Sequence, residues 1–395
     1  MYNIRKVTDD ITWIGASDRR LALFENIFPI KRGVSYNSYV LLDEQTVLFD
    51  TVDASVAGQF FENLEAALEG RTLDYLIVNH MEPDHCAMIG DIVRRYPAVK
   101  IVGNTKTFGM MNQFFGTDFS ERSVVVKEGD TLSAGKHTLH FVMAPMVHWP
   151  EAMVTYDDVD KVLFSADGFG SFGALNGNVF ADRDWLDDAR RYYTNIVGKY
   201  GASVQTLLKK AAGLEIAVIC PLHGPIWREN LSYILEKYQK WSTYEAEDQA
   251  VVIMYASMYG NTASAADALA GALAVRGVKK IAVYDVSNAH VSELISEIFR
   301  ASHLVFAAPT YNAGIYPVIE NLLSDMKALA VQKKTVAVME NGTWAPTAAK
   351  QVKEKISEMK DMTILDTGLT IKSAMHADQK AELDALADAI VNSMV

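Results

Sequence analysis

The second half of the chain alternates apolar strands with helices, and this alternation restricts the fold more than any other feature. Between residues 250 and 395 we expect five strands, AVVIMYA, KIAVYDV, HLVFAAP, KTVAVME and MTILDT, with a helix after each. Strands with such continuous apolar runs are typical of sheets that are covered on both faces. The pattern therefore predicts an α/β domain with a doubly wound parallel sheet.

The first half has a different rhythm, in which short apolar strands are broken by Gly, Asn and Asp. Predicted strands cover residues 38–42, 46–50, 73–78, 100–103, 123–126, 139–144, 161–165 and 215–220, with helices at 54–70 and over about 182–212. Mixed strands and helices favour stacked sheets with helical cover. The polar stretch STYEAEDQ (242–249) separates the halves, so we expect two domains, residues 1–246 and 247–395.

Composition narrows the class of protein. Of the 395 residues, 50% are hydrophobic and 22% are charged, as in soluble globular proteins, and the formal net charge is −12. This net negative charge argues against binding to nucleic acid or anionic lipid, because such binding needs clustered Lys and Arg on the protein surface. Only two cysteines occur, Cys86 and Cys220, and the N-terminus does not have the pattern of a signal peptide. We therefore expect a cytoplasmic protein that binds neither nucleic acid nor membrane.

A dense group of metal-ligand residues lies in VNHMEPDHCAMIG (78–90), which holds His80, Glu82, Asp84 and His85. A tight segment after a strand can direct alternating residues toward one point. The motif alone is also compatible with a solvated polar turn. Three more candidates each follow an apolar strand and favour the metal interpretation: His148, Asp167 and His223. The other five histidines lack this context, and we interpret them as surface or packed residues: His137, His140, His290, His303 and His376.

The loop SMYGNT (257–262) joins the first strand of the second domain to a helix. Its backbone N–H groups and hydroxyls, with the helix N-terminus, can bind a phosphate. The loop lacks the lysine of a nucleoside triphosphatase and the GxGxxG of dinucleotide binders. Two further loops, AAPTYNAG (307–314) and ENGTWAP (340–346), follow the third and fourth strands. Open parallel sheets bind ligands at these carboxyl ends.

These motifs resemble a known family. The metallo-β-lactamase fold carries HxHxDH after an early strand, followed by a distant His, an Asp and a final His, and here Glu82 replaces the second His. The motif HxExDH in this fold, together with a flavodoxin-like Gly-Asn-Thr loop, resembles the flavodiiron proteins. An oxygen ligand in place of nitrogen suits iron better than zinc. The resemblance implies a metallo-β-lactamase-like αββα domain followed by a flavodoxin-like domain.

The resemblance also implies the cofactors, which are two iron ions and FMN. His80, Glu82 and His148 would bind one iron, Asp84 and His223 the other, and Asp167 would bridge them, while the role of His85 stays open. Tyr311, Asn312 and Trp344 would be the main contacts of the flavin ring. The full set of implied FMN-binding residues is Ser257, Met258, Tyr259, Gly260, Asn261, Thr262, Pro309, Thr310, Tyr311, Asn312, Ala313, Gly314, Asn341, Gly342, Thr343 and Trp344.

By the same resemblance, the expected activity is reduction of dioxygen to water, of nitric oxide to nitrous oxide, or of both. Electrons would come from an external donor, a rubredoxin or a reduced deazaflavin. Tyr193 and His85 are the candidate catalytic residues, and a head-to-tail homodimer or a dimer of dimers is expected. Two alternatives remain: a zinc-dependent hydrolase with an appended flavodoxin-like domain, and a flavodoxin-like electron carrier whose first domain is structural. Glu82 and the intact loops oppose the first, and the complete ligand set opposes the second.

Overall fold

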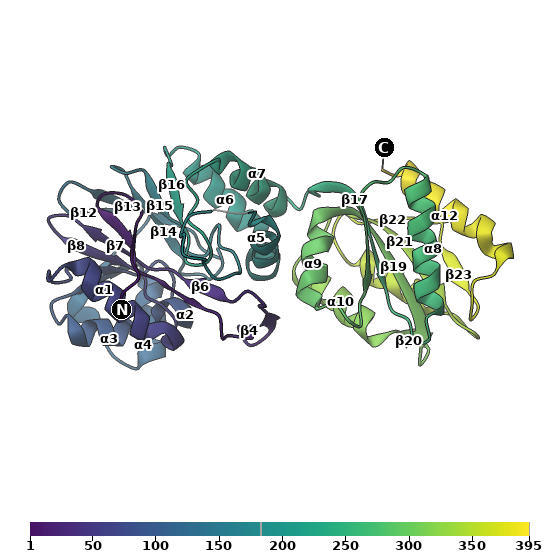
Figure 1. The fold of residues 1–395 in the computed structure, drawn as a ribbon, viewed down its shortest axis with the longest axis horizontal. Coiled ribbons are helices and arrows are strands. Elements are labelled where there is room, and N and C mark those ends of the chain that lie inside the picture. The colour runs from purple at the N-terminus through teal and green to yellow at the C-terminus, as the bar shows by residue number, and fades with distance from the viewer. Residues whose placement is uncertain (182–183, 395) are drawn as a thin grey trace. The chain divides into compact units, whose positions relative to one another are not determined.

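The computed structural model describes residues 1–181 and 184–394 (Figure 1). The chain divides into two compact units, Met1–Gln239 and Lys240–Val395. Helix α7 (Leu231–Ser242) precedes the first strand of the second unit, β17 (Asp248–Tyr255). The sequence-based boundary between residues 246 and 247 lies between these two elements and stays a prediction.

The first unit contains two stacked sheets. The seven-stranded sheet has the order β1 (Arg5–Lys6), β2 (Ile11–Trp13), β7 (Tyr39–Leu42), β8 (Thr46–Phe49), β9 (Tyr75–Ile77), β10 (Lys100–Gly103) and β11 (Ser123–Val125). The five-stranded sheet has the order β12 (Thr131–Ser133), β13 (Thr138–Met143), β14 (Met153–Asp157), β15 (Val162–Phe164) and β16 (Val218–Cys220). Two small hairpins pair β3 (Ala16–Asp18) with β6 (Val34–Tyr36), and β4 (Leu23–Phe24) with β5 (Phe28–Pro29).

Helices cover the outer faces of the two sheets, which gives the predicted αββα layering (Figure 1). On one side lie α1 (Ala57–Leu68), α2 (Pro83–Cys86), α3 (Ile89–Arg95) and α4 (Thr105–Phe115), and on the other α5 (Leu186–Tyr192), α6 (Gly201–Ala211) and α7. Between the sheets, Phe49 of β8 stacks on Phe164 of β15 with ring centroids 3.7 Å apart. Short 3₁₀ turns occur at Ala54–Val56, Ser120–Arg122, Gly198–Tyr200 and Ala377–Gln379.

The long helical region expected at 182–212 is not one helix. A π-helical segment, Tyr193–Val197, and the turn at Gly198–Tyr200 separate α5 from α6. Such π segments widen the helix locally and are frequent at functional sites. The start of the predicted region, residues 182–183, lies outside the described residues.

The second unit is built on a parallel sheet with the order β18 (Ile281–Asp285), β17, β19 (Ala301–Tyr311), β21 (Thr335–Asn341) and a divided fifth strand. This is the 2-1-3-4-5 order of flavodoxin-like folds, so the predicted fold class is confirmed. The short β20 (Gly314–Ile315) pairs antiparallel with the end of β19. Helices α8 (Asn261–Val275) and α12 (Lys380–Asn392) cover one face, while α9 (Val291–Arg300) and α10 (Pro317–Ala328), with α11 (Ala348–Ser357) against α10, cover the other (Figure 1).

The fifth strand differs from the prediction, which placed one strand at MTILDT. The structure has two short strands, β22 (Thr363–Ile364) and β23 (Leu369–Ile371), which pair with the beginning and the end of β21. Between them Gly368 approaches the Val338 carbonyl so closely that a Cβ would lie 2.9 Å from that oxygen. The close backbone approach explains the glycine, and β23 carries the chain to the edge where a ligand would bind.

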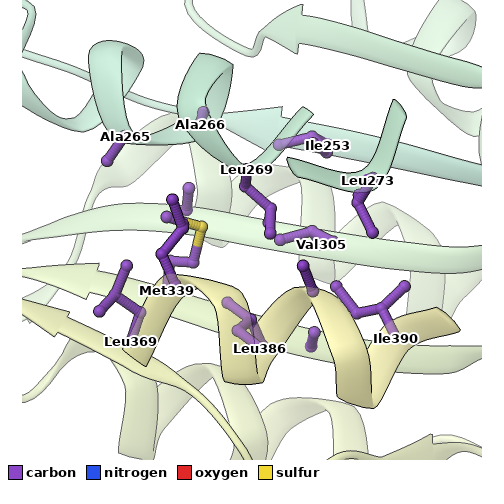
Figure 2. Packing of buried hydrophobic residues seen from close by; sticks show 14 of the residues in the cluster. Ile253, Ala265, Ala266, Leu269, Leu273, Val305, Met339, Leu369, Leu386 and Ile390 are labelled. Atoms are coloured by element: carbon purple, nitrogen blue, oxygen red, sulfur yellow. The ribbon is translucent and has the colours of Figure 1, made fainter. Parts of the chain in front are cut away.

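The core of the second unit lies between the sheet and the pair α8 and α12 (Figure 2). Leu269 and Leu273 of α8 and Leu386 and Ile390 of α12 all lie in this layer and are buried, together with Val305 of β19. Among the described residues, no helix is long and apolar enough to cross a membrane.

Lys334 gives a pH-dependent prediction for the stability of this unit. Its side chain is buried, and its Nζ donates to the carbonyls of Phe299 and Ala301 at 2.9 and 2.8 Å. Burial lowers the pKa of Lys334 to about 7. An unfolded lysine has a pKa of about 10.4. Between about pH 7 and about pH 10.4, Lys334 therefore carries a proton in the unfolded chain more often than in the folded protein. The free energy of unfolding must then rise with pH over this range.

Between pH 7.5 and 9.5 we expect Lys334→Met to reduce the slope of unfolding free energy against pH by up to about 1.4 kcal/mol per pH unit. Urea unfolding at several pH values measures this slope. The matched control is Lys333→Met, because Lys333 is exposed and should leave the slope unchanged. Equal slopes for the wild type and Lys334→Met would contradict the burial argument.

Candidate metal centre and flavin pocket

The motif at residues 80–85 reaches its geometry through a loop and a short helix. His80 and Glu82 lie in the loop that follows β9, and Glu82 has extended dihedral angles, φ −64° and ψ 142°. Pro83 then starts α2, so Asp84 and His85 lie in a helical turn. Proline is favoured at a first helical position because its φ is already suitable. The expectation of a simple i, i+2, i+4 alternation is therefore wrong for the second half of the motif.

The other three candidates come from the second sheet. β15 and β16 are parallel neighbours in which Phe164 is paired with Cys220, and Asp167 and His223 each lie three residues beyond this pair. His148 follows an apolar strand as the sequence predicts, because β13 ends at Met143 and His148 lies in the turn after it. The structure thus brings all seven predicted metal-ligand residues to one edge of the two sheets.

The first group of ligand atoms consists of His80, Glu82, His148 and one oxygen of Asp167. Nε2 of His148 lies 2.9 Å from Glu82 Oε2 and 3.0 Å from Asp167 Oδ2. Nε2 of His80 lies 3.2 Å from the same Glu82 oxygen and 3.4 Å from Asp167 Oδ2. Two nitrogens and two oxygens therefore face a common point.

The second group consists of Asp84, His85 and His223. The Nε2 atoms of His85 and His223 lie 2.9 Å apart, and His223 Nε2 lies 3.2 Å from Asp84 Oδ2. The second oxygen of Asp167, Oδ1, lies 3.3 Å from His85 Nε2. Asp167 therefore presents one oxygen to each group, and His85, whose role was open, faces the second group.

Several contacts in these groups are unfavourable unless cations are bound. His223 Nδ1 is 2.8 Å from the Ser35 carbonyl, which requires a proton on Nδ1 and leaves a lone pair on Nε2 facing His85. Both oxygens of Asp84 and of Asp167 are buried, and among the described residues they face only imidazole nitrogens of the two groups. Buried carboxylates are costly unless positive charge compensates them, so this donor set fits two metal ions.

The electrostatics agree with this interpretation. Burial would lower the pKa of His148, but hydrogen bonds to Asp167 and Glu82 raise it to about 9. Burial likewise opposes ionisation of Asp167, yet His80 and His85 hold its pKa well below the usual value. The carboxylates thus attract positive charge to this edge, and metal ions would replace the protons of the imidazoles.

The supporting hydrogen bonds were not predicted from the sequence. Glu151 Oε1 lies 2.8 Å from His80 Nδ1 and also accepts from the backbone N–H of Met81. Asp50 accepts from the backbone N–H groups of Asn79 and His80. Such partners fix the orientation of a ligating imidazole and raise its basicity. Glu151 directly follows the His148-Trp-Pro turn, and this position next to a ligand is the one sequence signal that could have identified it.

Two adjacent tyrosines lie in this region, and the structure distinguishes them. The ring of Tyr192 is 5.5 Å from that of His223, and its hydroxyl is buried with no hydrogen-bond partner in the described part of the chain. The ring of Tyr193, the residue selected from the sequence, lies 5.0 Å from that of Tyr238. Neighbouring helical residues point in different directions, and the sequence does not reveal which one faces the ligands.

The second unit has a pocket of about 440 Å³ at the carboxyl ends of its strands. Thirteen of the sixteen predicted FMN-binding residues line it, while Gly260, Tyr311 and Gly314 do not. Ala345 and Ser373 line it in addition. Ser373 follows β23, and its N–H and carbonyl bond to the Asn341 side chain at 3.1 and 2.9 Å. Ser373 is not predicted from the sequence, because the predicted fifth strand MTILDT ends before β23 begins.

The pocket fits a phosphate and a flat ring. The N-terminus of α8 opens into it, and its N-cap, Gly260, has φ 92° and provides no side-chain cap. The first-turn N–H groups of a helix lack intrahelical partners and can bind an anion. Tyr259 and Trp344 are 91% and 81% exposed at the pocket, so a bound ring would cover apolar surface that otherwise faces solvent.

Comparison with known proteins agrees with both sites. The chain matches the family described as ODP family beta lactamase over residues 34–224, and the flavodoxin family over residues 253–387. An anaerobic nitric oxide reductase flavorubredoxin from Salmonella typhi is 30% identical over 390 residues, which is 96% of this chain and 79% of that protein. An uncharacterised protein of Methanocaldococcus jannaschii is 30% identical over 376 residues, with 94% of each chain covered.

Solved structures are similar over nearly the whole chain. The rubredoxin oxygen:oxidoreductase of the anaerobe Desulfovibrio gigas has a TM-score of 0.91 and 29% identity, covering 99% of this chain and 98% of that one. A variant of the flavo di-iron protein from Thermotoga maritima has a TM-score of 0.90 and 26% identity, with 99% and 98% covered. The chain therefore belongs to the flavodiiron proteins. It is an oxidoreductase, and its predicted cofactors, two iron ions and FMN, are confirmed.

For the metal centre, we expect Glu151→Gln to weaken metal binding about 10- to 100-fold, because the substitution removes the anionic partner of His80 Nδ1. Metal content after dialysis against graded chelator concentrations measures this. FMN content should not change. Glu215→Gln is the control, since that carboxylate is 83% exposed and should leave metal affinity as in the wild type. Wild-type affinity in Glu151→Gln would show that this bond does not support the centre.

For the flavin pocket, we expect Trp344→Ala to raise the FMN dissociation constant roughly tenfold, through loss of ring stacking. Tyr311→Ala is the matched control, because Tyr311 does not line the pocket and should change the constant less than about twofold. Fluorescence titration of the flavin-free protein with FMN measures both. A larger effect of Tyr311→Ala would mean that the ring lies on the Tyr311 side.

Proposed function

We propose that this protein reduces dioxygen to water, nitric oxide to nitrous oxide, or both, at a diiron centre, with electrons that arrive through FMN. The observation that carries the proposal is Asp167, whose two oxygens face the two separate groups of ligand atoms. Two metals held a few ångströms apart suit a small diatomic substrate. Relatives named for nitric oxide reduction and for oxygen reduction support the same chemistry.

The electron count explains why one chain has both sites. Reduction of one dioxygen molecule to two water molecules needs four electrons and four protons. Reduction of two nitric oxide molecules to one nitrous oxide and one water needs two electrons and two protons. Bound iron and flavin would store and transfer these electrons. The protein residues bind the metals, exclude water and position protons. Which substrate is preferred depends on side chains around the metals, and assays with both gases would decide it.

Each ligand has a proposed role. His80, Glu82 and His148 would bind one iron, Asp84, His85 and His223 would bind the other, and Asp167 would offer one oxygen to each. Glu82 favours iron over zinc, because an anionic oxygen ligand stabilises the higher metal charge. For proton delivery we propose Tyr192, whose buried hydroxyl lacks a hydrogen-bond partner in the described structure beside the His223 ring. The role of Tyr193 stays a prediction from resemblance.

The partners follow from the family. The electron donor is an external protein or cofactor, for which we propose a rubredoxin or a reduced deazaflavin. A head-to-tail homodimer, or a dimer of such dimers, would pair the FMN of one chain with the irons of another. Sedimentation equilibrium would give the mass of two or four chains, and a single-chain mass would contradict this proposal. Two buried, unpaired cysteines are consistent with a cytoplasmic location.

The central test is substitution of Glu82 or Asp167 by alanine. We expect dioxygen and nitric oxide turnover, measured with chemically reduced protein, to fall at least about 100-fold in each variant while FMN stays bound. Glu121→Ala, at an exposed carboxylate, is the control. Full turnover in both variants would contradict the proposal. Zinc retained after expression in iron-rich medium would instead favour the metallo-β-lactamase-like hydrolase.

A further inference from the structure

A third group of metal-ligand atoms lies in the first unit and shares no residue with the iron site. It consists of Asp10, His137 and Asp160, whose ligand atoms all lie within 4.8 Å of one another. Asp10 precedes β2 of the seven-stranded sheet, whereas His137 precedes β13, and Asp160 lies in the turn between β14 and β15 of the five-stranded sheet. The group therefore joins the two sheets.

The imidazole of His137 is held in one orientation. It is fully buried, and its Nδ1 lies 2.9 Å from Asp157 Oδ1. Asp157 is also fully buried, and its other oxygen accepts the backbone N–H of Asp160 at 2.8 Å. A fixed carboxylate at Nδ1 selects the tautomer with its proton on Nδ1, as in carboxylate–histidine–metal arrangements. Nε2 then faces Asp10 Oδ2, 3.1 Å away.

This geometry needs positive charge between the imidazole and the carboxylate oxygen, which a proton on the ring or a bound metal ion can supply. Asp160 adds to the need, since its Oδ2 is buried and has no hydrogen-bond partner in the described residues. Asp43 accepts the backbone N–H of His137 at 2.7 Å and brings a fourth carboxylate. The cation that pairs with Asp10 is Lys136, at 2.8 Å, and its side chain is 59% exposed. This exposed ammonium interacts with three carboxylates, Asp10, Asp160 and Asp43.

We propose that Asp10, His137 and Asp160 bind a divalent transition-metal ion, with Zn²⁺ as the ion that best fits one imidazole nitrogen and two carboxylate oxygens. Water would complete the coordination from the side of Asp10, whose side chain is 31% exposed. Asp157 acts as the outer partner of His137. The ion links the loop before β2 to the ends of β13 and β14, so its role is structural, and His137 is not the ordinary packed histidine that the sequence indicates.

The test uses the holoprotein with both irons and FMN bound, dialysed against Zn²⁺ and analysed for zinc and iron per chain. We expect one zinc per chain in addition to two irons, and a thermal midpoint that rises with zinc. Asp160→Asn should lose at least about tenfold in zinc affinity and lose the midpoint shift. This variant keeps the size of the side chain and the backbone N–H bond to Asp157, so it should fold.

Asp158→Asn is the matched control. Asp158 directly follows β14 and lies 2.9 Å from His140 of β13, but it does not belong to the group of three ligands. This variant should bind zinc as the wild type does. Equal zinc binding in the wild type and Asp160→Asn, or none in the wild type, would overturn the proposal, and His137 would then be a histidinium held by carboxylates. Zinc gained only with loss of iron would also overturn it, because the ion would then occupy the iron site.

Discussion

The convergence of buried carboxylates and imidazoles on Asp167 is the constraint on which the first unit depends. Asp167 is 1% exposed, and its two oxygens face imidazole nitrogens of His148 and His85 at 3.0 and 3.3 Å. A carboxylate in such a place is tolerated only when cations compensate it. The fold meets this requirement by bringing ligands from both sheets to one edge. Folding of this edge and metal binding are therefore coupled.

The two units use the same structural rule for different chemistry. In each, the functional side chains lie in loops just beyond strand ends, where loops can vary without disturbing the buried sheet, and except for His148 in the first unit these strands have parallel neighbours. In the first unit, the paired strands β15 and β16 place Asp167 and His223 in register. In the second, β17, β19, β21 and β23 each lead to a loop that lines the pocket. Rigid strands thus fix the positions of residues that lie on loops.

Much of the fold and the candidate site could be predicted from the sequence. The seven ligand residues were identified because each follows a recognisable apolar strand, and the flavin loops because they follow strands of one parallel sheet. Glu151 and Ser373 were not predicted. Each reaches its site only through the tertiary fold, and neither lies in a recognisable sequence motif. The proximity of Tyr192 to His223 was not predicted for a related reason, because a π-helical segment begins at Tyr193 and alters the helical phase, and the role of Tyr193 stays a prediction.

The sequence by itself determined the fold class, the two-domain order, the types of metal ligands and the chemistry that they suit. These depend on local periodicity and on residue type, which are written in the chain directly. Only the tertiary structure decided which oxygen of Asp167 faces which group, that His85 faces the second group, and that Asp10, His137 and Asp160 come together. Those contacts join residues far apart in sequence, and their geometry is set by the register and stacking of two sheets, which no local pattern specifies.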